Sequence, residues 1–189
     1  MSKRSVEPKN TLCPQTAFLV GTYREDGAAN FGLFCWVTYC WDGELSMIVS
    51  IGGGKLTRDR IRATGVFSAN LVTEPLLPLA DYFGSNSGYD KGKMDVGFNV
   101  MPGAVLPVPV LADSPWSFEL EVKRSMELDD GIVFLCVIRN VLADEAYLAE
   151  GMAMEEKLAA ARPVLCMPEV YFSVGKQLGT WGQWKELKK

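Results

Sequence analysis

The chain of 189 residues contains no histidine, and this absence removes several kinds of catalytic site. A Ser–His–Asp triad, a Cys–His pair and an imidazole general base all need that residue. Zinc sites built on histidine are excluded as well, and the five cysteines include no C-x-x-C pair that could replace them. We therefore expect no bound metal. If the protein is an enzyme, a cofactor is expected to supply its chemistry.

Long apolar segments are also missing. The most apolar stretches are interrupted by proline or are too short to cross a bilayer, and no signal-peptide pattern follows the basic N-terminus. The formal net charge of −4 gives no general attraction to nucleic acid or to an anionic membrane. We therefore expect a cytoplasmic protein with reduced cysteines that binds neither nucleic acid nor membrane. The length and the lack of a linker indicate one domain over residues 1–189.

Short runs of β-branched and aromatic residues dominate the pattern. Residues 17–23, 30–40 and 44–51 are three such runs joined by short turns, which predicts an antiparallel meander. A later pair of long runs is joined by a turn of the sequence Asp-Asp-Gly. The further strands are expected at residues 66–72, 116–128, 131–142 and 171–174.

A few short helices are expected between the strands. Thr57 is predicted to cap a helix over residues 58–63, which Gly65 ends. Residues 84–103 form a long loop of the kind that often carries function. Two further helices are expected at residues 75–83 and 152–161. The pattern as a whole predicts a mainly β protein, a β-barrel with small helices.

The stretch "SIGGGKLTRDRIRATG", residues 50–65, has the composition of an anion-binding site. The first N–H groups of a helix lack internal partners, and Lys55 and Thr57 add a positive charge and a hydroxyl group. The stretch is not a P-loop, because Leu56 stands where that motif needs Ser or Thr. It also lacks the third glycine of a dinucleotide fingerprint. The alternative is a flexible turn followed by a solvent-exposed basic helix.

The loop "GSNSGYDKGK", residues 84–93, contains the same ingredients. Ser85, Ser87, Lys91 and Lys93 stand on a glycine-rich backbone. Alone, this segment has the composition of an ordinary solvent-exposed loop. Two such segments in one small acidic chain favour a phosphate-bearing cofactor.

Four stretches together carry a resemblance to a known family. They are "LVGTYREDGAANFGLFCW", "KLTRDRIRATGVFSANL", "GSNSGYDK" and "RPVLCMPEVYFSVGKQLG". In this order and spacing, from about Leu12 to Gly179, the chain resembles the flavin reductase-like family of FMN-binding split β-barrels. Within that family it most resembles the flavoredoxins.

The resemblance implies a homodimer that binds FMN at or near the subunit interface. Lys55 and Thr57 would hold the phosphate, with help from Ser87 and Lys91, and residues 34–37 would lie along the isoalloxazine ring. Further hydrogen bonds would reach the flavin or its ribityl chain, and no catalytic residue is implied. The implied cofactor-binding residues are Asn30, Phe34, Cys35, Trp36, Val37, Ser50, Ile51, Lys55, Leu56, Thr57, Asn70, Leu71, Ser85, Ser87 and Lys91.

Cys35 and Trp36 also have plain structural interpretations. Trp36 could be a core aromatic residue rather than a wall of the flavin site. Cys35 could tune the flavin or exchange electrons with it, or it could be a buried structural cysteine, since no second thiol has a redox-motif spacing. In a single strand, Cys35 and Cys40 would face opposite sides, so no pairing between them is expected.

Three functions remain open at this point. The first is an FMN-dependent oxidoreductase that takes a hydride from NAD(P)H or electrons from a redox partner protein. The second is a non-enzymatic FMN electron carrier, and the third is a flavin-binding module without turnover. Many NAD(P)H-dependent members of the family have a Gly-Asp-His element near the late hairpin. Here the corresponding turn is Asp129-Asp130-Gly131, which weakens the expectation of NAD(P)H.

Overall fold

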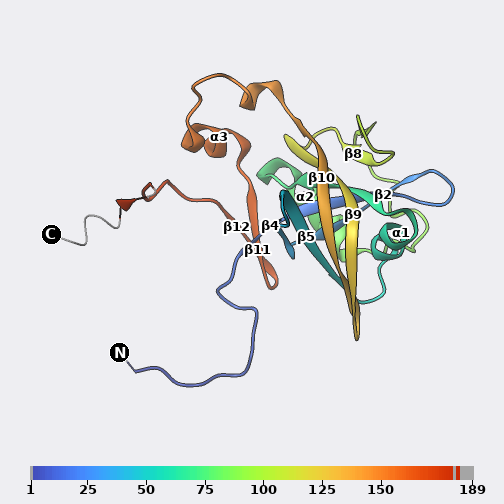
Figure 1. Ribbon diagram of the computed structural model, residues 1–189, viewed down its shortest axis with the longest axis horizontal. Helices are drawn as coiled ribbons and strands as arrows, with labels where there is room; N and C mark the ends of the chain where they lie inside the picture. The colour runs from blue at the N-terminus through green and yellow to red at the C-terminus, as the bar shows by residue number, and fades with distance from the viewer. Residues whose placement is uncertain (1, 181, 184–189) are drawn as a thin grey trace.

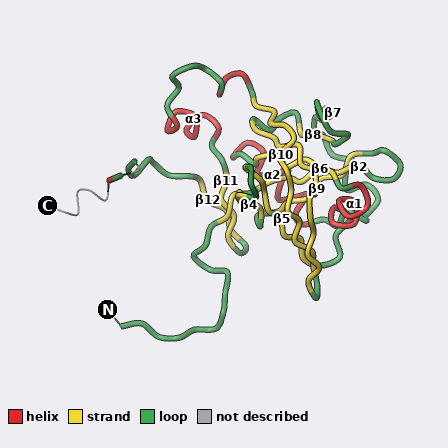
Figure 2. Tube along the Cα trace, in the orientation of Figure 1, coloured by secondary structure: helices red, strands yellow, loops and turns green. Residues whose placement is uncertain are grey.

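Strands form the body of the computed structural model, which describes residues 2–180 and 182–183 (Figure 1). In chain order the elements are β1 Gln15–Thr16, β2 Phe18–Tyr23, β3 Ala29–Phe34, β4 Val37–Trp41, β5 Leu45–Gly52, α1 Leu56–Thr64, β6 Val66–Leu71, η1 Glu74–Leu76, α2 Leu77–Ser85, β7 Val100–Pro102, β8 Pro109–Leu111, β9 Trp116–Leu128, β10 Gly131–Ala143, η2 Glu145–Tyr147, α3 Met154–Ala161, β11 Val164–Met167 and β12 Val170–Ser173. Figure 2 shows α1 and α3 on opposite sides of the strands.

Seven strands form the main sheet in the order β3-β2-β6-β9-β10-β5-β4, and every neighbouring pair is antiparallel. The long β9–β10 hairpin has register shifts between Leu135 and Cys136 and between Ile138 and Asn140. Such irregularities bend a sheet and increase its twist. The first and last strands of this order, β3 and β4, are not paired with each other, so the sheet is a barrel with an open seam.

The predicted strand over residues 30–40 is wrong as a single element. It breaks at Cys35 and Trp36 into β3, which pairs with β2, and β4, which pairs with β5. Its two halves therefore lie at opposite edges of the sheet, and the expected meander does not form. The backbone at the break is held by a hydrogen bond from the Ser50 N–H to the Trp36 carbonyl, 2.9 Å long.

The core consists of two apolar clusters on the two faces of β2. Phe18 and Val20 belong to the cluster inside the barrel, which Ile61 of α1 completes. Ala17 and Leu19 belong to a second cluster beneath α2, β3 and β8. Alternate residues of a strand point to opposite faces, so burial on both sides explains the nearly continuous apolar sequence of β2.

Helix α1 begins at Leu56, two residues earlier than the sequence predicted. Its N-cap is Lys55, which provides no side-chain cap, whereas Thr57 lies inside the helix and is buried. The predicted capping role of Thr57 is therefore wrong. Gly65 ends the helix as predicted, in the left-handed conformation with φ of 74°. That conformation favours glycine because it has no Cβ.

The second half of the chain follows the expected pattern closely. The strands predicted at residues 116–128 and 131–142 form the β9–β10 hairpin, and the helix predicted at residues 152–161 is α3. Strand β11 was not predicted; it pairs with β1 and β12 in a small sheet. Within the described residues, no helix is long and apolar enough to cross a membrane.

Candidate functional site

Two cavities open on either side of the break between β3 and β4. Phe34 lines one of them, and the following residues 35–38 line the other. Consecutive residues at the break therefore form part of the wall of both cavities. We call them the polar cavity and the thiol cavity.

The polar cavity has a volume of about 230 Å³ and lies between the start of α1 and the end of α2. It brings together the two anion-type segments that the sequence analysis identified. No acidic side chain is among the described residues that line it. The lining residues are Gly32, Leu33, Phe34, Gly54, Lys55, Leu56, Thr57, Phe83, Gly84, Ser85, Asn86, Ser87, Gly88 and Lys93.

Lys93 is the most unusual group in the polar cavity, because its ammonium group is buried. The residue is 5% exposed, and its Nζ donates a hydrogen bond of 2.9 Å to the Phe31 carbonyl. Nζ also lies 5.7 Å from the centre of the Phe83 ring. Burial and, to a smaller extent, the charge of Lys55 lower the pKa of Lys93 from its ordinary value to about 8, and Asp90 opposes this change. An anion in the cavity would compensate both the burial and the repulsion.

Thr57 is positioned for an anion by a buried asparagine beneath it. The Nδ2 atom of Asn30 donates to the Thr57 Oγ1 at 3.0 Å and to the Thr22 Oγ1 at 3.2 Å. Because the Thr57 oxygen accepts this bond, its own hydroxyl proton is available to donate into the cavity. Asn30 is itself fully buried, and its Oδ1 has no hydrogen-bond partner.

The walls of the polar cavity depend on close backbone approach at Gly88. A Cβ atom built at this position would lie 2.8 Å from the Leu56 Cβ and 3.0 Å from the Asn30 Oδ1. The absence of a side chain therefore lets the loop after α2 approach α1. This approach leaves a small polar space between the start of α1 and the end of α2.

The thiol cavity is larger, about 710 Å³, and mostly apolar. Trp36 is half exposed there, at 53%, whereas Val37 is buried. Burial raises the pKa of the Cys35 thiol to about 11, and the neighbouring Cys166 thiol acts in the same direction. The lining residues are Lys9, Asn10, Cys13, Gln15, Cys35, Trp36, Val37, Thr38, Ile48, Ser50, Cys166, Met167, Pro168 and Glu169.

Most of the predicted cofactor-binding residues reach one of the two cavities. Asn30 lies directly beneath the polar cavity, through its bond to Thr57. Those that line the polar cavity are Phe34, Lys55, Leu56, Thr57, Ser85 and Ser87, and those that line the thiol cavity are Cys35, Trp36, Val37 and Ser50.

Four predicted residues lie elsewhere. Ile51 is fully buried in the barrel core. Asn70 is fully buried and bonded within the protein: its Nδ2 donates to the Leu19 carbonyl at 2.8 Å, and its Oδ1 accepts from the Ser117 hydroxyl at 2.8 Å. Leu71 lines a separate apolar cavity beside β9 and α3, and Lys91 is exposed outside the polar cavity.

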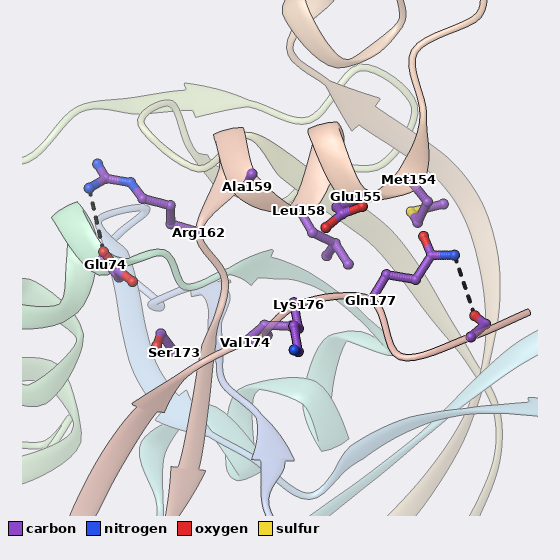
Figure 3. Close-up of a pocket in the computed structure, with 12 residues that line it drawn as sticks. Glu74, Met154, Glu155, Leu158, Ala159, Arg162, Ser173, Val174, Lys176 and Gln177 are labelled. Atoms are coloured by element: carbon purple, nitrogen blue, oxygen red, sulfur yellow. Dashed lines mark hydrogen bonds and ion pairs between the residues drawn. The ribbon is translucent and has the colours of Figure 1, made fainter.

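A further cavity of about 600 Å³ lies between α3 and residues 173–179, and Figure 3 shows its lining side chains. Arg162 pairs there with Glu74 at 3.4 Å. None of the predicted cofactor-binding residues lines this cavity. It is therefore separate from the site around the strand break.

Sequence reasoning missed two contributions to the site. It gave Lys91 a supporting role beside Lys55 and Thr57 at the phosphate, whereas Lys93 of the same loop is the lysine that lines the polar cavity. The signal that separates the two lysines is the Phe31 carbonyl, which only the folded chain brings to Lys93. It also missed Cys166, which the pairing of β11 with β1 brings to the thiol cavity.

Several solved structures have the same fold as this protein over nearly the whole length of the chain. Flavoredoxin from Methanosarcina acetivorans is similar with a TM-score of 0.87 and 24% identity, covering 99% of this chain and 100% of that chain. Flavoredoxin of Desulfovibrio vulgaris (Miyazaki F) has a TM-score of 0.85 and 26% identity, covering 96% and 98%. An FMN-binding protein from Thermus thermophilus, solved with bound p-hydroxybenzaldehyde, has a TM-score of 0.74 and 21% identity, covering 95% and 97%.

Sequence matches are consistent with this result. An uncharacterized protein of Aeropyrum pernix is 33% identical over 91 residues, which is 47% of this chain and 35% of that relative. The match thus spans about a third of the length of this curated relative. The flavin reductase like domain family matches residues 11–171.

Proposed function

The chain belongs to the flavin reductase-like domain family, and from that membership we propose that it binds FMN and transfers electrons through it as an oxidoreductase. The mainly β split-barrel fold predicted from the sequence is confirmed. This family includes FMN-dependent oxidoreductases. The observation that carries the proposal is the polar cavity, where Lys55, Lys93 and Thr57 converge beside the strand break.

The polar cavity fits a phosphate group. It offers two ammonium groups, the Thr57 hydroxyl and the hydroxyls of Ser85 and Ser87. Charge-assisted hydrogen bonds to phosphate are stronger than neutral ones. A bound phosphate would also offset the two effects that lower the pKa of Lys93, which are its burial and the repulsion from Lys55.

The thiol cavity fits the ring end of a flavin. An apolar slot with a few fixed polar groups is typical of sites for flat aromatic ligands, and this cavity combines Trp36 and Val37 with the polar side chain of Ser50. The residues of the strand break would orient the ring and shield one face from water.

When bound, FMN supplies the hydride-transfer chemistry that no side chain of this chain can supply. The role of the protein is to hold the phosphate end with charge and the ring end by shape. Hydride transfer depends on proximity and orientation more than on a base. The lack of histidine is therefore compatible with turnover.

We propose NAD(P)H or a redox partner protein as the electron donor. The turn between β9 and β10 contains Asp129 and Asp130 and lacks the histidine that many NAD(P)H-dependent members have. This difference favours a second candidate function, a non-enzymatic FMN electron carrier that receives electrons from a protein. A flavin-binding module without turnover is a third.

A visible absorption spectrum of the purified protein, followed by anaerobic additions of NADH and NADPH, tests these functions. Flavin bands that bleach within a catalytic timescale support the oxidoreductase. Flavin bands that persist, but bleach on addition of dithionite, support the carrier. Protein that carries no flavin and binds none on addition of FMN contradicts all three.

We also propose that the chain forms a homodimer. The edge strand β4 and the start of β5 carry exposed apolar side chains, with Trp41 at 76%, Tyr39 at 55% and Leu45 at 53% exposure. In Figure 1, α3 and the segment after β12 extend away from the main sheet, which leaves them available to a second copy. Size-exclusion chromatography with light scattering tests this proposal, and a monomeric mass at micromolar concentration would contradict it.

A further inference from the structure

Two cysteines that are far apart in the sequence meet in the thiol cavity. Cys35 stands in the break between β3 and β4, and Cys166 stands in β11. Cys166 pairs with Gln15 of β1, and it lines the thiol cavity together with Val37 and Thr38 at the start of β4. Both residues line the cavity, and both are free rather than disulfide-bonded. The Cys166 thiol is near enough to add to the rise that burial causes in the pKa of Cys35.

The other cysteines have different surroundings. Cys136 is fully buried in the barrel core, and Cys40 lies on β4 outside the thiol cavity. Cys13 also lines the cavity but is exposed, and its Sγ accepts a hydrogen bond of 3.1 Å from Gln15. Among the residues that the structure describes, no group of cysteines and carboxylates is arranged to hold a metal ion. The presence of Cys35 and Cys166 together in the wall of the thiol cavity therefore needs an explanation.

We propose that Cys35 and Cys166 form a reversible disulfide that exchanges two electrons with the bound flavin and with a small-molecule disulfide that enters the thiol cavity. This inference rests on the proposed function, because the flavin ring is expected to lie along residues 34–37. It adds a substrate class, low-molecular-weight disulfides, to that function.

The two steps balance. In the first, the Cys35–Cys166 bond accepts two electrons from reduced flavin and two protons, the S–S bond breaks, and two thiols and oxidised flavin result. In the second, one protein thiolate attacks the external disulfide and releases one small thiol. The other cysteine then attacks the mixed disulfide, which forms the Cys35–Cys166 bond and releases the second small thiol.

The cavity also predicts how the exchange depends on pH. The thiolate is the nucleophile, and burial raises the pKa of Cys35 to about 11. Its thiolate fraction is therefore small at neutral pH. At pH values below this pKa, each rise of one pH unit increases the thiolate fraction about tenfold. Any step in which Cys35 attacks becomes faster as the pH rises through this range.

The first experiment detects the disulfide itself. The purified protein, with and without FMN, is incubated with oxidised glutathione, its remaining thiols are alkylated, and its peptides are analysed by mass spectrometry. A Cys35–Cys166 peptide that disappears with dithiothreitol is expected in the wild type and in the matched control C40S. It should be absent from C35S and C166S. A wild type that yields no such peptide, or that yields only Cys13 disulfides, overturns the inference.

The second experiment counts electrons. Oxidised protein with FMN bound and excess glutathione removed is titrated anaerobically with dithionite, and the flavin spectrum and free thiols are recorded. Four electrons per chain are expected for the wild type and C40S, and two for C35S and C166S. Two electrons in the wild type, with the disulfide intact, overturn the exchange with flavin.

These readouts separate the inference from the proposed function. Protein that forms the disulfide peptide but binds no FMN overturns both the proposed function and the flavin step. Protein that binds FMN but forms no Cys35–Cys166 peptide overturns only the inference. Measuring FMN binding by the C35S and C166S variants distinguishes loss of the thiol pair from loss of the cavity.

Discussion

The polar cavity and the thiol cavity share one wall but have opposite chemistry. The polar cavity is small and concentrates Lys55, Lys93 and several hydroxyl groups between two helix ends. The thiol cavity has about three times the volume, about 710 Å³ against about 230 Å³, and is lined by Trp36, Val37 and thiols. The difference shows how one flavin could be held by two separable means, with charge at one end and shape at the other.

The lysines of the polar cavity should give the largest effect. Replacement of Lys93 or Lys55 by methionine should weaken FMN binding by about tenfold to a hundredfold, because a hydrogen bond to a charged group contributes about 1.5 to 3 kcal/mol. Riboflavin, which lacks the phosphate, should bind both variants as it binds the wild type. Fluorescence titration with the two ligands measures this directly.

Lys91→Met is the matched control, since Lys91 is exposed and lies outside the polar cavity. We expect it to change FMN affinity less than threefold. A larger loss with Lys91→Met than with Lys93→Met would restore the assignment that the sequence suggested and contradict the role of the buried lysine.

The next largest effect should be the pH dependence of FMN binding, which distinguishes the contribution of the polar cavity from that of the thiol cavity. The pKa of Lys93 is lowered to about 8 by burial and by Lys55, and phosphate binds its protonated form. FMN affinity should therefore fall as the pH rises above 8, by up to about tenfold at pH 9. Riboflavin affinity should stay constant over this range, and Lys93→Met should abolish the pH dependence of FMN binding. Equal pH profiles for FMN and riboflavin would contradict the charge-based mechanism.

The same lowered pKa affects the stability of the ligand-free protein. Lys93 binds protons more weakly in the folded than in the unfolded state, so its burial penalty is fully present below about pH 8. Stability should rise as the pH increases from about 8 towards the ordinary lysine pKa near 10.5, relative to Lys93→Met. Urea unfolding at several pH values tests this sign.

Gly88→Ala should have an intermediate effect on the polar cavity. The added Cβ would lie 2.8 Å from the Leu56 Cβ, so the loop must move away from α1. We expect FMN affinity to fall by about fivefold, about 1 kcal/mol, with a smaller change for riboflavin. Gly97→Ala is the control, because its Cβ would meet nothing within 4 Å. Equal losses in the two variants would point to a general effect of the glycine replacement.

Trp36→Ala should give the smallest effect, at the other end of the site. Trp36 is 53% exposed, so its removal takes away only part of an aromatic contact, and an affinity loss of about threefold is expected, since each factor of ten equals about 1.4 kcal/mol. FMN and riboflavin should lose the same factor, because both carry the ring. A loss confined to FMN would place Trp36 on the phosphate side instead.

Local signals predicted the parts of the fold that depend on neighbours in the chain. The β9–β10 hairpin follows from two long strand-like runs joined by an Asp-Asp-Gly turn. Gly65 ends α1 because glycine adopts the left-handed conformation at little cost. The break at Cys35 and Trp36 carries no such signal. The apolar run continues through it, and only pairing with two different strands divides it.

The site shows the same limit. The sequence identified the two segments that form the polar cavity, because lysine, hydroxyl and glycine residues cluster in each. It could not select between Lys91 and Lys93, since the choice depends on the Phe31 carbonyl that lies on another strand. Nor could it bring Cys166 to Cys35, because that contact depends on the β1–β11 pairing.

The buried ammonium of Lys93 has a consequence for the lifetime of the protein. A chain without an anion in the polar cavity keeps the buried charge of Lys93 without a bound counter-ion, so it should open more often than a loaded chain. Proteases cleave the opened form. The loop around Lys93 would thus make the abundance of the protein follow the supply of its ligand, with unloaded chains removed first.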